Sequence, residues 1–122
     1  MAQATANLFV DWGTGVHTPP WQANDGLPIA PGQTTVFDLF GLAGVAPPLN
    51  VVTQGSGQGL YVTSIDGVVQ NDGGNGFWWV YLVNGAQPTV GAGAYLLADG
   101  DSVAWDYKHY SSGLKQATHP GL

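Results

Sequence analysis

The side chains best suited to binding chemistry are aromatic and gather in the run Phe77-Trp78-Trp79-Val80-Tyr81. Trp78 and Trp79 are adjacent, so on a strand they point to opposite faces of the sheet. One ring can then fill the core while the other covers the opposite face, where an exposed aromatic suits a flat ligand, a sugar or a protein. The alternative is that both rings are buried, the second under the loop of residues 13–31.

Residue types used in catalysis are present, but their spacing does not fit known catalytic motifs. All eight acidic residues are Asp. Gly55-Ser56-Gly57 lacks the outer glycine and the following helix of a nucleophile elbow. The run from Gly55 to Gly59 resembles a phosphate-binding loop, but it precedes a strand and contains no Lys. We therefore expect no catalytic residues and no enzymatic activity.

Potential metal ligands are similarly scattered. His17, His109 and His119 form neither an HxH nor an HExxH pattern. Asp99-Gly100-Asp101 with Asp106 offers the carboxylate oxygens that calcium prefers. No EF-hand spacing follows, however, and Asp-Gly is a common turn pair. We expect a turn there and no metal site.

Charge excludes several classes of partner. The formal net charge is −6, there is no Arg, and Lys108 and Lys115 are the two cations. Nucleic-acid binding depends on Lys and Arg, so nucleic acids and anionic membranes are poor partners. No apolar run reaches 18 residues, so membrane insertion is not expected. Low charge with many Gly, Thr and Asn favours an extracytoplasmic location, secreted, periplasmic or at the cell surface.

One segment, residues 35–43, has the pattern of a helix. Thr34 or Thr35 can cap it, and Asp38 falls in its first turn. Apolar residues follow with helical spacing, and Gly44 and Pro47-Pro48 prevent continuation. A helix of two to three turns is not stable alone, so we expect it to pack across a sheet.

The remaining segments predict strands and turns. Residues 8–12 alternate as in a strand, and the proline-rich stretch 13–31 predicts an irregular loop. Phe77–Val83 is almost continuously apolar, which predicts a central strand covered on both faces. In Ser102–His109, Val103, Trp105 and Tyr107 share one side. Further strands are expected at 49–53, 60–65, 68–70 and 95–97, with turns at 66–67, 84–85 and 99–100.

The expected organisation is one domain over residues 1–122, with a core from about 6 to 110 and a loosely ordered tail at 111–122. One short helix packed across a mixed sheet is an α+β arrangement, of which the β-grasp is the natural small fold. An all-β sandwich is the alternative if residues 35–43 are not helical.

Four segments follow one another in a characteristic order and spacing. They are Gly59–Gly67, Trp78–Gly85, Val90–Tyr95 and Asp99–Val103, and Gly32–Leu39 precedes them. In this order and spacing they resemble the transcobalamin-like C-terminal domain family, the domain of unknown function 4430, over about residues 6 to 110. They also resemble the C-terminal β domain of vitamin B12 carriers such as intrinsic factor and transcobalamin.

The resemblance implies a β-grasp module that is usually exported. In the carriers this domain closes over one face of the corrinoid and a helical barrel supplies the rest of the pocket, for which this chain has no room. The carrier segment that approaches the ligand corresponds here to Gln58–Ser64, and the aromatic strand start to Phe77–Trp79. Gln58 stands where the carriers place a Trp. The resemblance thus implies cobalamin as a candidate ligand, with no cofactor required.

We therefore predict a non-enzymatic module whose partner is a small-molecule ligand, a corrinoid or another flat molecule, or a protein. A structural or adhesive protein-interaction domain and a carbohydrate-binding module are the alternatives. Aromatic faces would supply contact area, and backbone groups near Gly57 and Gly59 would supply hydrogen bonds. The predicted ligand-binding residues are Gln58, Gly59, Leu60, Tyr61, Trp78, Trp79 and Tyr81.

Overall fold

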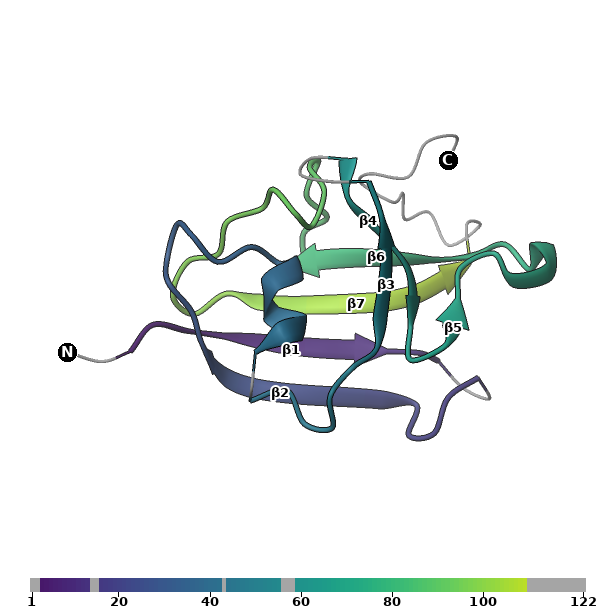
Figure 1. Ribbon diagram of the computed structural model, residues 1–122, viewed down its shortest axis with the longest axis horizontal. Coiled ribbons are helices and arrows are strands. Elements are labelled where there is room, and N and C mark those ends of the chain that lie inside the picture. Colours follow the sequence, from purple (N-terminus) through teal and green to yellow (C-terminus); the bar gives the residue numbers. More distant parts are fainter. Residues whose placement is uncertain (1–2, 14–15, 43, 56–58, 110–122) are drawn as a thin grey trace.

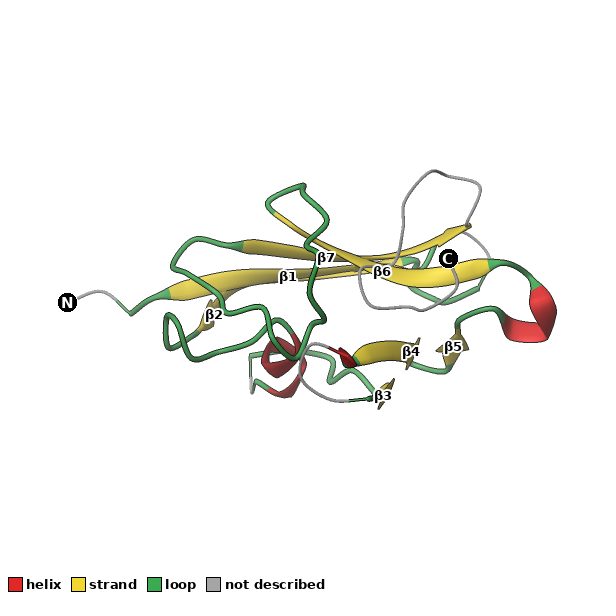
Figure 2. Cartoon of the chain, turned by 90° about the horizontal axis from the view of Figure 1, so that it is seen from above, coloured by secondary structure: helices red, strands yellow, loops and turns green. Residues whose placement is uncertain are grey.

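Two β-sheets form two layers in the computed structural model, which describes residues 3–13, 16–42, 44–55 and 59–109 (Figures 1 and 2). The larger sheet has the strand order β2-β1-β7-β6, and the smaller one the order β3-β4-β5. β1 and β7 are parallel, and the other neighbours are antiparallel. The strands are β1 (Thr5–Asp11), β2 (Trp21–Pro28), β3 (Val51–Gln54), β4 (Tyr61–Ile65), β5 (Val68–Val69), β6 (Phe77–Val83) and β7 (Ser102–His109).

The predicted helix at residues 35–43 is not present in residues 35–42, the part of this segment that the structure describes. Only one 3-10 turn, η1 (Phe37–Gly41), forms in this region, and Leu42 is already extended with ψ 144°. Two glycines, Gly41 and Gly44, lower the stability of a longer helix. Bonds from Leu39 N–H to the Val36 carbonyl and from Leu42 N–H to the Leu39 carbonyl give a three-residue period instead.

The prediction of an α+β, β-grasp-like fold with a helix packed across the sheet was therefore wrong. The described residues form a mostly β structure whose helical elements are short 3-10 turns, η1 and η3 (Asp72–Gly74). The all-β alternative agrees with this architecture. No described helix has the length and apolar character needed to cross a bilayer.

The run Phe77–Val83 forms β6, but β6 is an outer strand rather than the predicted central one. Trp79, Tyr81 and Val83 point into the core, and Val80 is buried on the other side of the strand. The run is continuously apolar because side chains are buried on both faces of β6, although this strand has only one neighbour among the described strands of the sheet, β7. The strand flanked on both sides is β7, together with β1 (Figure 1).

The prediction that residues 13–31 are irregular was wrong for their second half, which forms β2. Gln22 and Leu27 are the buried residues of this strand, so its composition is that of an exposed edge. Gly26, with φ +68°, lies where the register with β1 shifts. Prolines precede and end the strand, as is tolerated at a sheet edge.

The local predictions elsewhere were confirmed, with two exceptions. β5 is shorter than expected, and the predicted strand at residues 95–97 is reduced to an isolated bridge between Leu96 and Thr35. The two turns Asp66-Gly67 and Asn84-Gly85 have positive φ at both positions, which two-residue hairpin turns need. Side chains of both sheets form one hydrophobic core between the layers. The predicted tail, residues 111–122, lies outside the described residues.

Candidate functional site

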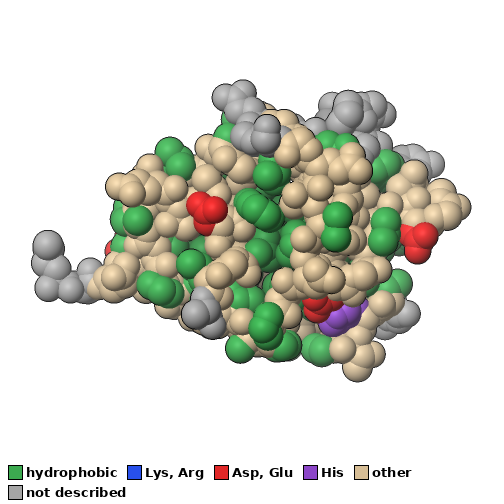
Figure 3. All heavy atoms as spheres, viewed as in Figure 1, with side chains coloured by type: hydrophobic (Ala, Val, Ile, Leu, Met, Phe, Trp, Pro, Cys, Tyr) green, Lys and Arg blue, Asp and Glu red, His purple; other side chains and the backbone are tan. Residues whose placement is uncertain are grey.

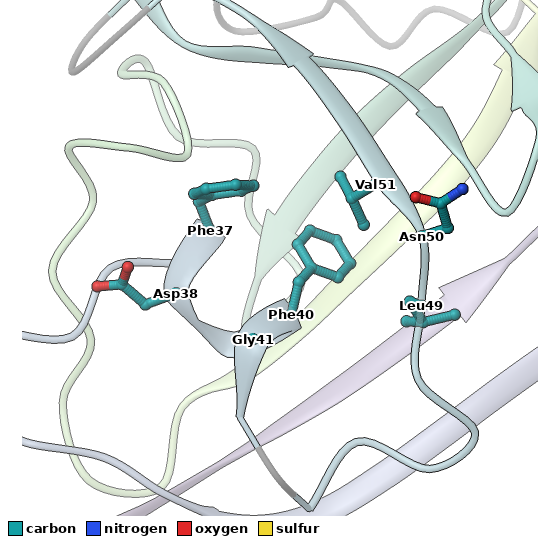
Figure 4. A pocket seen from close by; sticks show the side chains of 7 residues that line it. All are labelled: Phe37, Asp38, Phe40, Gly41, Leu49, Asn50 and Val51. Atoms are coloured by element: carbon teal, nitrogen blue, oxygen red, sulfur yellow. The ribbon is translucent and has the colours of Figure 1, made fainter.

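A cleft of about 350 Å³ opens between η1 and the start of β3 (Figure 4). The Phe37 and Phe40 rings form one wall, and Leu49 and Val51 lie opposite them. Hydrophobic side chains are visible near the middle of this face of the molecule (Figure 3). The lining residues are Phe37, Asp38, Phe40, Gly41, Leu49, Asn50 and Val51.

Two reciprocal hydrogen bonds at the start of η1 hold the cleft wall that carries Phe37 and Phe40. Thr35 N–H donates to the Asp38 carboxylate (2.9 Å), and Asp38 N–H donates to the Thr35 hydroxyl (3.1 Å). This is the arrangement of a capping box. Phe37 N–H also donates to the carbonyl of Ala92 (3.0 Å), which ties η1 to a distant loop. Asp38 is thereby engaged in local structure, and its side chain points away from Val51 (Figure 4).

The β3 wall is held by the turn between β4 and β5. Asn50 N–H donates to Asp66 Oδ1 (2.7 Å), and Asp66 N–H returns a bond to the Asn50 carbonyl (2.7 Å). The other carboxylate oxygen of Asp66 lies 3.3 Å from His17 Nε2. His17 in turn stacks on Trp12, with ring centroids 3.7 Å apart. Segments far apart in sequence therefore position this wall.

Beneath the cleft lies the aromatic core of the large sheet. Phe40 is 8% exposed, and its ring centroid lies 5.4 Å from that of Trp105 on β7. Trp105 in turn contacts Tyr81, 5.1 Å away. Burial, with a smaller contribution from Tyr95, raises the pKa of Tyr81 above its usual range. The Tyr81 hydroxyl donates to the carbonyl of Val90, so it is a structural group.

Those predicted ligand-binding residues that the structure describes do not gather on one surface. Gly59 is exposed, and Leu60 and Tyr61 are half-buried, with the Tyr61 hydroxyl donating to Gln54 Oε1 (2.9 Å). Gln58 lies outside the described residues.

The predicted aromatic residues of β6 divide between the two faces of the large sheet. Trp79 and Tyr81 are in the core, and the Trp79 indole N–H donates to the Val68 carbonyl (2.8 Å). Trp78, next to Trp79 on the strand, is half-buried on the opposite face. The aromatic run therefore provides both core and surface side chains.

Sequence reasoning missed the cleft residues because they looked like core of the expected helix and a short strand. Phe37 and Phe40 are three positions apart, which fits a helix facing a sheet. A usable signal was the pair of glycines and the two prolines after them, since these keep the segment short, and Phe37 remains only partly buried.

Several acidic side chains and His17 have hydrogen-bond partners within the fold. Thr5 N–H donates to Asp99 and Ala98 N–H donates to Asp101, both at 2.9 Å, which confirms the predicted turn. Nδ1 of His17 lies 2.6 Å from the Pro19 carbonyl oxygen. Across the described part of the chain, no group of three or more His or Asp side chains could hold a metal ion.

Two solved structures share this fold at low sequence identity. A Ruminococcus gnavus protein for which metal binding has been suggested matches with a TM-score of 0.60 and 17% identity, over 88% of this chain and 98% of that chain. Haptocorrin in complex with cobinamide (Cbi) matches with a TM-score of 0.62 and 18% identity, over 85% of this chain. The match spans only 25% of the haptocorrin chain.

The sequence itself matches a family model. No curated protein matches the sequence. Residues 49–109, half of the chain, match the model described as "Domain of unknown function (DUF4430)". These residues include β3 to β7, and hence one wall of the cleft and the strand beneath it. The chain belongs to the DUF4430 family.

Proposed function

We propose that this chain is a non-enzymatic binding module that takes a flat, uncharged small molecule in the cleft between η1 and β3. The observation that carries the proposal is the cleft itself, about 350 Å³ in volume and walled by two Phe rings, a Leu and a Val. Small-molecule sites are concave, mostly apolar and usually of about 300–1,000 Å³. Apolar walls favour a ligand that presents an aromatic or aliphatic face.

Charge narrows the ligand class. None of the seven lining residues is basic, and Asp38 lies at the rim. The formal net charge of the chain is −6. An anionic ligand would therefore meet repulsion without a cationic partner, and burying its charge would be costly. An uncharged ligand avoids both costs.

A corrinoid is the finer candidate, supported by the shared fold with cobinamide-bound haptocorrin. The cleft is too small to enclose a corrinoid ring system, so such a ligand would rest one edge between Phe37 and Val51. Its remaining surface would need a second protein or domain. An extracytoplasmic location belongs to the proposal as well, supported by the low content of charged residues, 8%.

The test uses two neighbouring residues of β3. Val51 lines the cleft, whereas Val52 is 50% exposed on the other side of the strand. Cobinamide and naphthalene are titrated separately into the wild type, V51K and V52K, with binding followed by amide chemical shifts. We expect V51K to abolish the shifts around η1 and V52K to preserve them. Equal binding by V51K and the wild type would refute the cleft as the site.

One exposed aromatic residue favours a second candidate, a carbohydrate-binding module. Trp21 is 55% exposed on the edge strand β2, and its ring packs edge-on against Phe9 with centroids 5.8 Å apart. An indole held in this way can stack on a sugar ring, and Asp11, its register partner, can accept hydroxyl hydrogen bonds. Binding to a glycan array that is lost in W21A and kept in V51K would favour this candidate.

A further inference from the structure

Three tryptophans lie in the core, and the indole N–H of one of them differs from the other two. Trp12 donates to the Ile65 carbonyl (3.0 Å), and Trp79 donates to the Val68 carbonyl (2.8 Å). Trp105 is 2% exposed, yet its Nε1 finds no acceptor anywhere in the part of the chain that the structure describes. A buried donor without a partner loses its hydration and gains nothing in return, so it is destabilising.

One side chain connects this donor to the cleft. Phe40 lines the cleft and is also the aromatic neighbour of Trp105, with the two ring planes inclined by 43°. Figure 4 shows the Phe40 ring on the cleft side of the large sheet, over the strands behind it. Phe40 is therefore a cleft residue whose ring contacts the Trp105 indole directly.

The hydrogen bonds that hold η1 are made by groups other than the Phe40 side chain. η1 has five residues, and its reciprocal capping bonds lie at its start, at Thr35 and Asp38. η1 ends at Gly41, and Leu42 is extended. A side-chain rotation at Phe40 would leave the capping bonds and the Phe37 anchor to Ala92 intact.

We infer that the cleft selects uncharged aromatic ligands with a hydrogen-bond acceptor, and that the Trp105 indole N–H donates to this acceptor once Phe40 turns aside. The inference rests on the proposed function and adds to it the polar group that determines which ligands the cleft prefers. The apolar walls bind the ring system, and the Trp105 donor distinguishes a ring nitrogen or carbonyl from a carbon. A ligand that pairs this donor is favoured over a ligand that leaves it unpaired.

The test compares two probes of nearly the same shape, quinoline, which has an acceptor nitrogen, and naphthalene, which has none. Proton–nitrogen spectra report each indole N–H separately. We expect quinoline to move the Trp105 signal downfield and naphthalene to leave it. The Trp12 and Trp79 signals serve as internal controls, because both donors are already bonded.

Affinities provide the second measurement. The quinoline-to-naphthalene affinity ratio should fall about fivefold in W105F, as expected for one hydrogen bond. F40L should raise the affinity for quinoline, because a smaller side chain leaves the donor more accessible. A general loosening of the core would change the affinities for quinoline and naphthalene alike, so it would leave their ratio within one variant unchanged.

The outcomes separate the two proposals. Binding of both probes at η1 with an unmoved Trp105 signal would overturn this inference and leave the proposed function standing. A Trp105 N–H signal already at a bonded position in the free protein would overturn it too. Failure of both probes to bind up to the limit of their solubility would overturn the proposed function and this inference together.

Discussion

Asp66 and Asn50 hold each other through two hydrogen bonds of 2.7 Å, one from the Asn50 N–H to the Asp66 carboxylate and one from the Asp66 N–H to the Asn50 carbonyl. Asn50 lines the cleft, whereas Asp66 occupies the β4–β5 turn with φ +52°. A turn residue thus fixes the start of a cleft wall. Asp is suited to both tasks, because it tolerates positive φ and offers a carboxylate.

Replacing Asp66 should test this link. We expect D66A to lower the free energy of unfolding by about 1–3 kcal/mol, because the Asn50 N–H loses its acceptor and Ala tolerates positive φ poorly. D66N should retain most of the stability, since Asn keeps an acceptor oxygen. Urea denaturation measures both variants, with D25A as a control at an exposed position. Equal stability of D66A and the wild type would contradict the link.

The two phenylalanines of the cleft should respond differently. Phe40 is 8% exposed and packs on Trp105, whereas Phe37 is only partly buried. F40A should therefore cost about 3–5 kcal/mol of unfolding free energy, and F37A clearly less. Both should weaken naphthalene binding. Thermal and urea unfolding give the stabilities, and a larger loss in F37A than in F40A would mean that Phe37, and not Phe40, contributes more to the core.

The tandem tryptophans provide a test of where the ligand binds. W79A should cost about 3–5 kcal/mol, since the ring is buried and its N–H is bonded to Val68. W78A should cost less and leave cleft binding unchanged, because Trp78 lies on the opposite face of the large sheet. If W78A abolished binding of cobinamide or naphthalene while the protein stayed folded, the site predicted from the sequence would replace the cleft.

Asp106 should make stability depend on pH. Its burial raises the pKa of the carboxyl, the neighbouring Asp11 raises it further, and Lys108 opposes both. A pKa above the unfolded value means that the folded state binds the proton more tightly, so stability falls as pH rises through this window. D106N should be more stable than the wild type at pH 7, by less than about 1 kcal/mol because the group is half-exposed.

The D106N difference should disappear below pH 3, where Asp106 is protonated in both the folded and the unfolded states. Unfolding free energies of the two proteins at pH 3, 5 and 7 check the sign. A wild-type protein that is more stable than D106N at pH 7 would mean that the carboxylate has a favourable partner that outweighs its burial.

Family membership could be predicted from the sequence even though the predicted architecture was wrong. The ordered segments from Gly59 to Val103 lie within the matched residues 49–109. The short segment that failed as a helix, residues 35–43, lies before them. The family pattern depends on strands and turns, and these form as expected from β3 to β7.

The sequence by itself determined the features that neighbouring residues control. Alternation set the bounds of β7 at Ser102–His109 and turned Val103, Trp105 and Tyr107 inward, and Asp66-Gly67 and Asn84-Gly85 formed the expected turns. Side-chain alternation and backbone sterics act over a few residues, so they can be predicted without knowing the fold.

Only the tertiary structure decided which strand is central, that residues 21–28 form a strand, and that Phe37 and Phe40 face Leu49 and Val51 across a cleft. An apolar run reports that both faces of a strand are covered, not how many strands flank it. A marginal segment such as 35–43 takes the conformation that its distant partners stabilise, here Ala92 and Tyr95. Those partners are brought close only by folding of the whole chain.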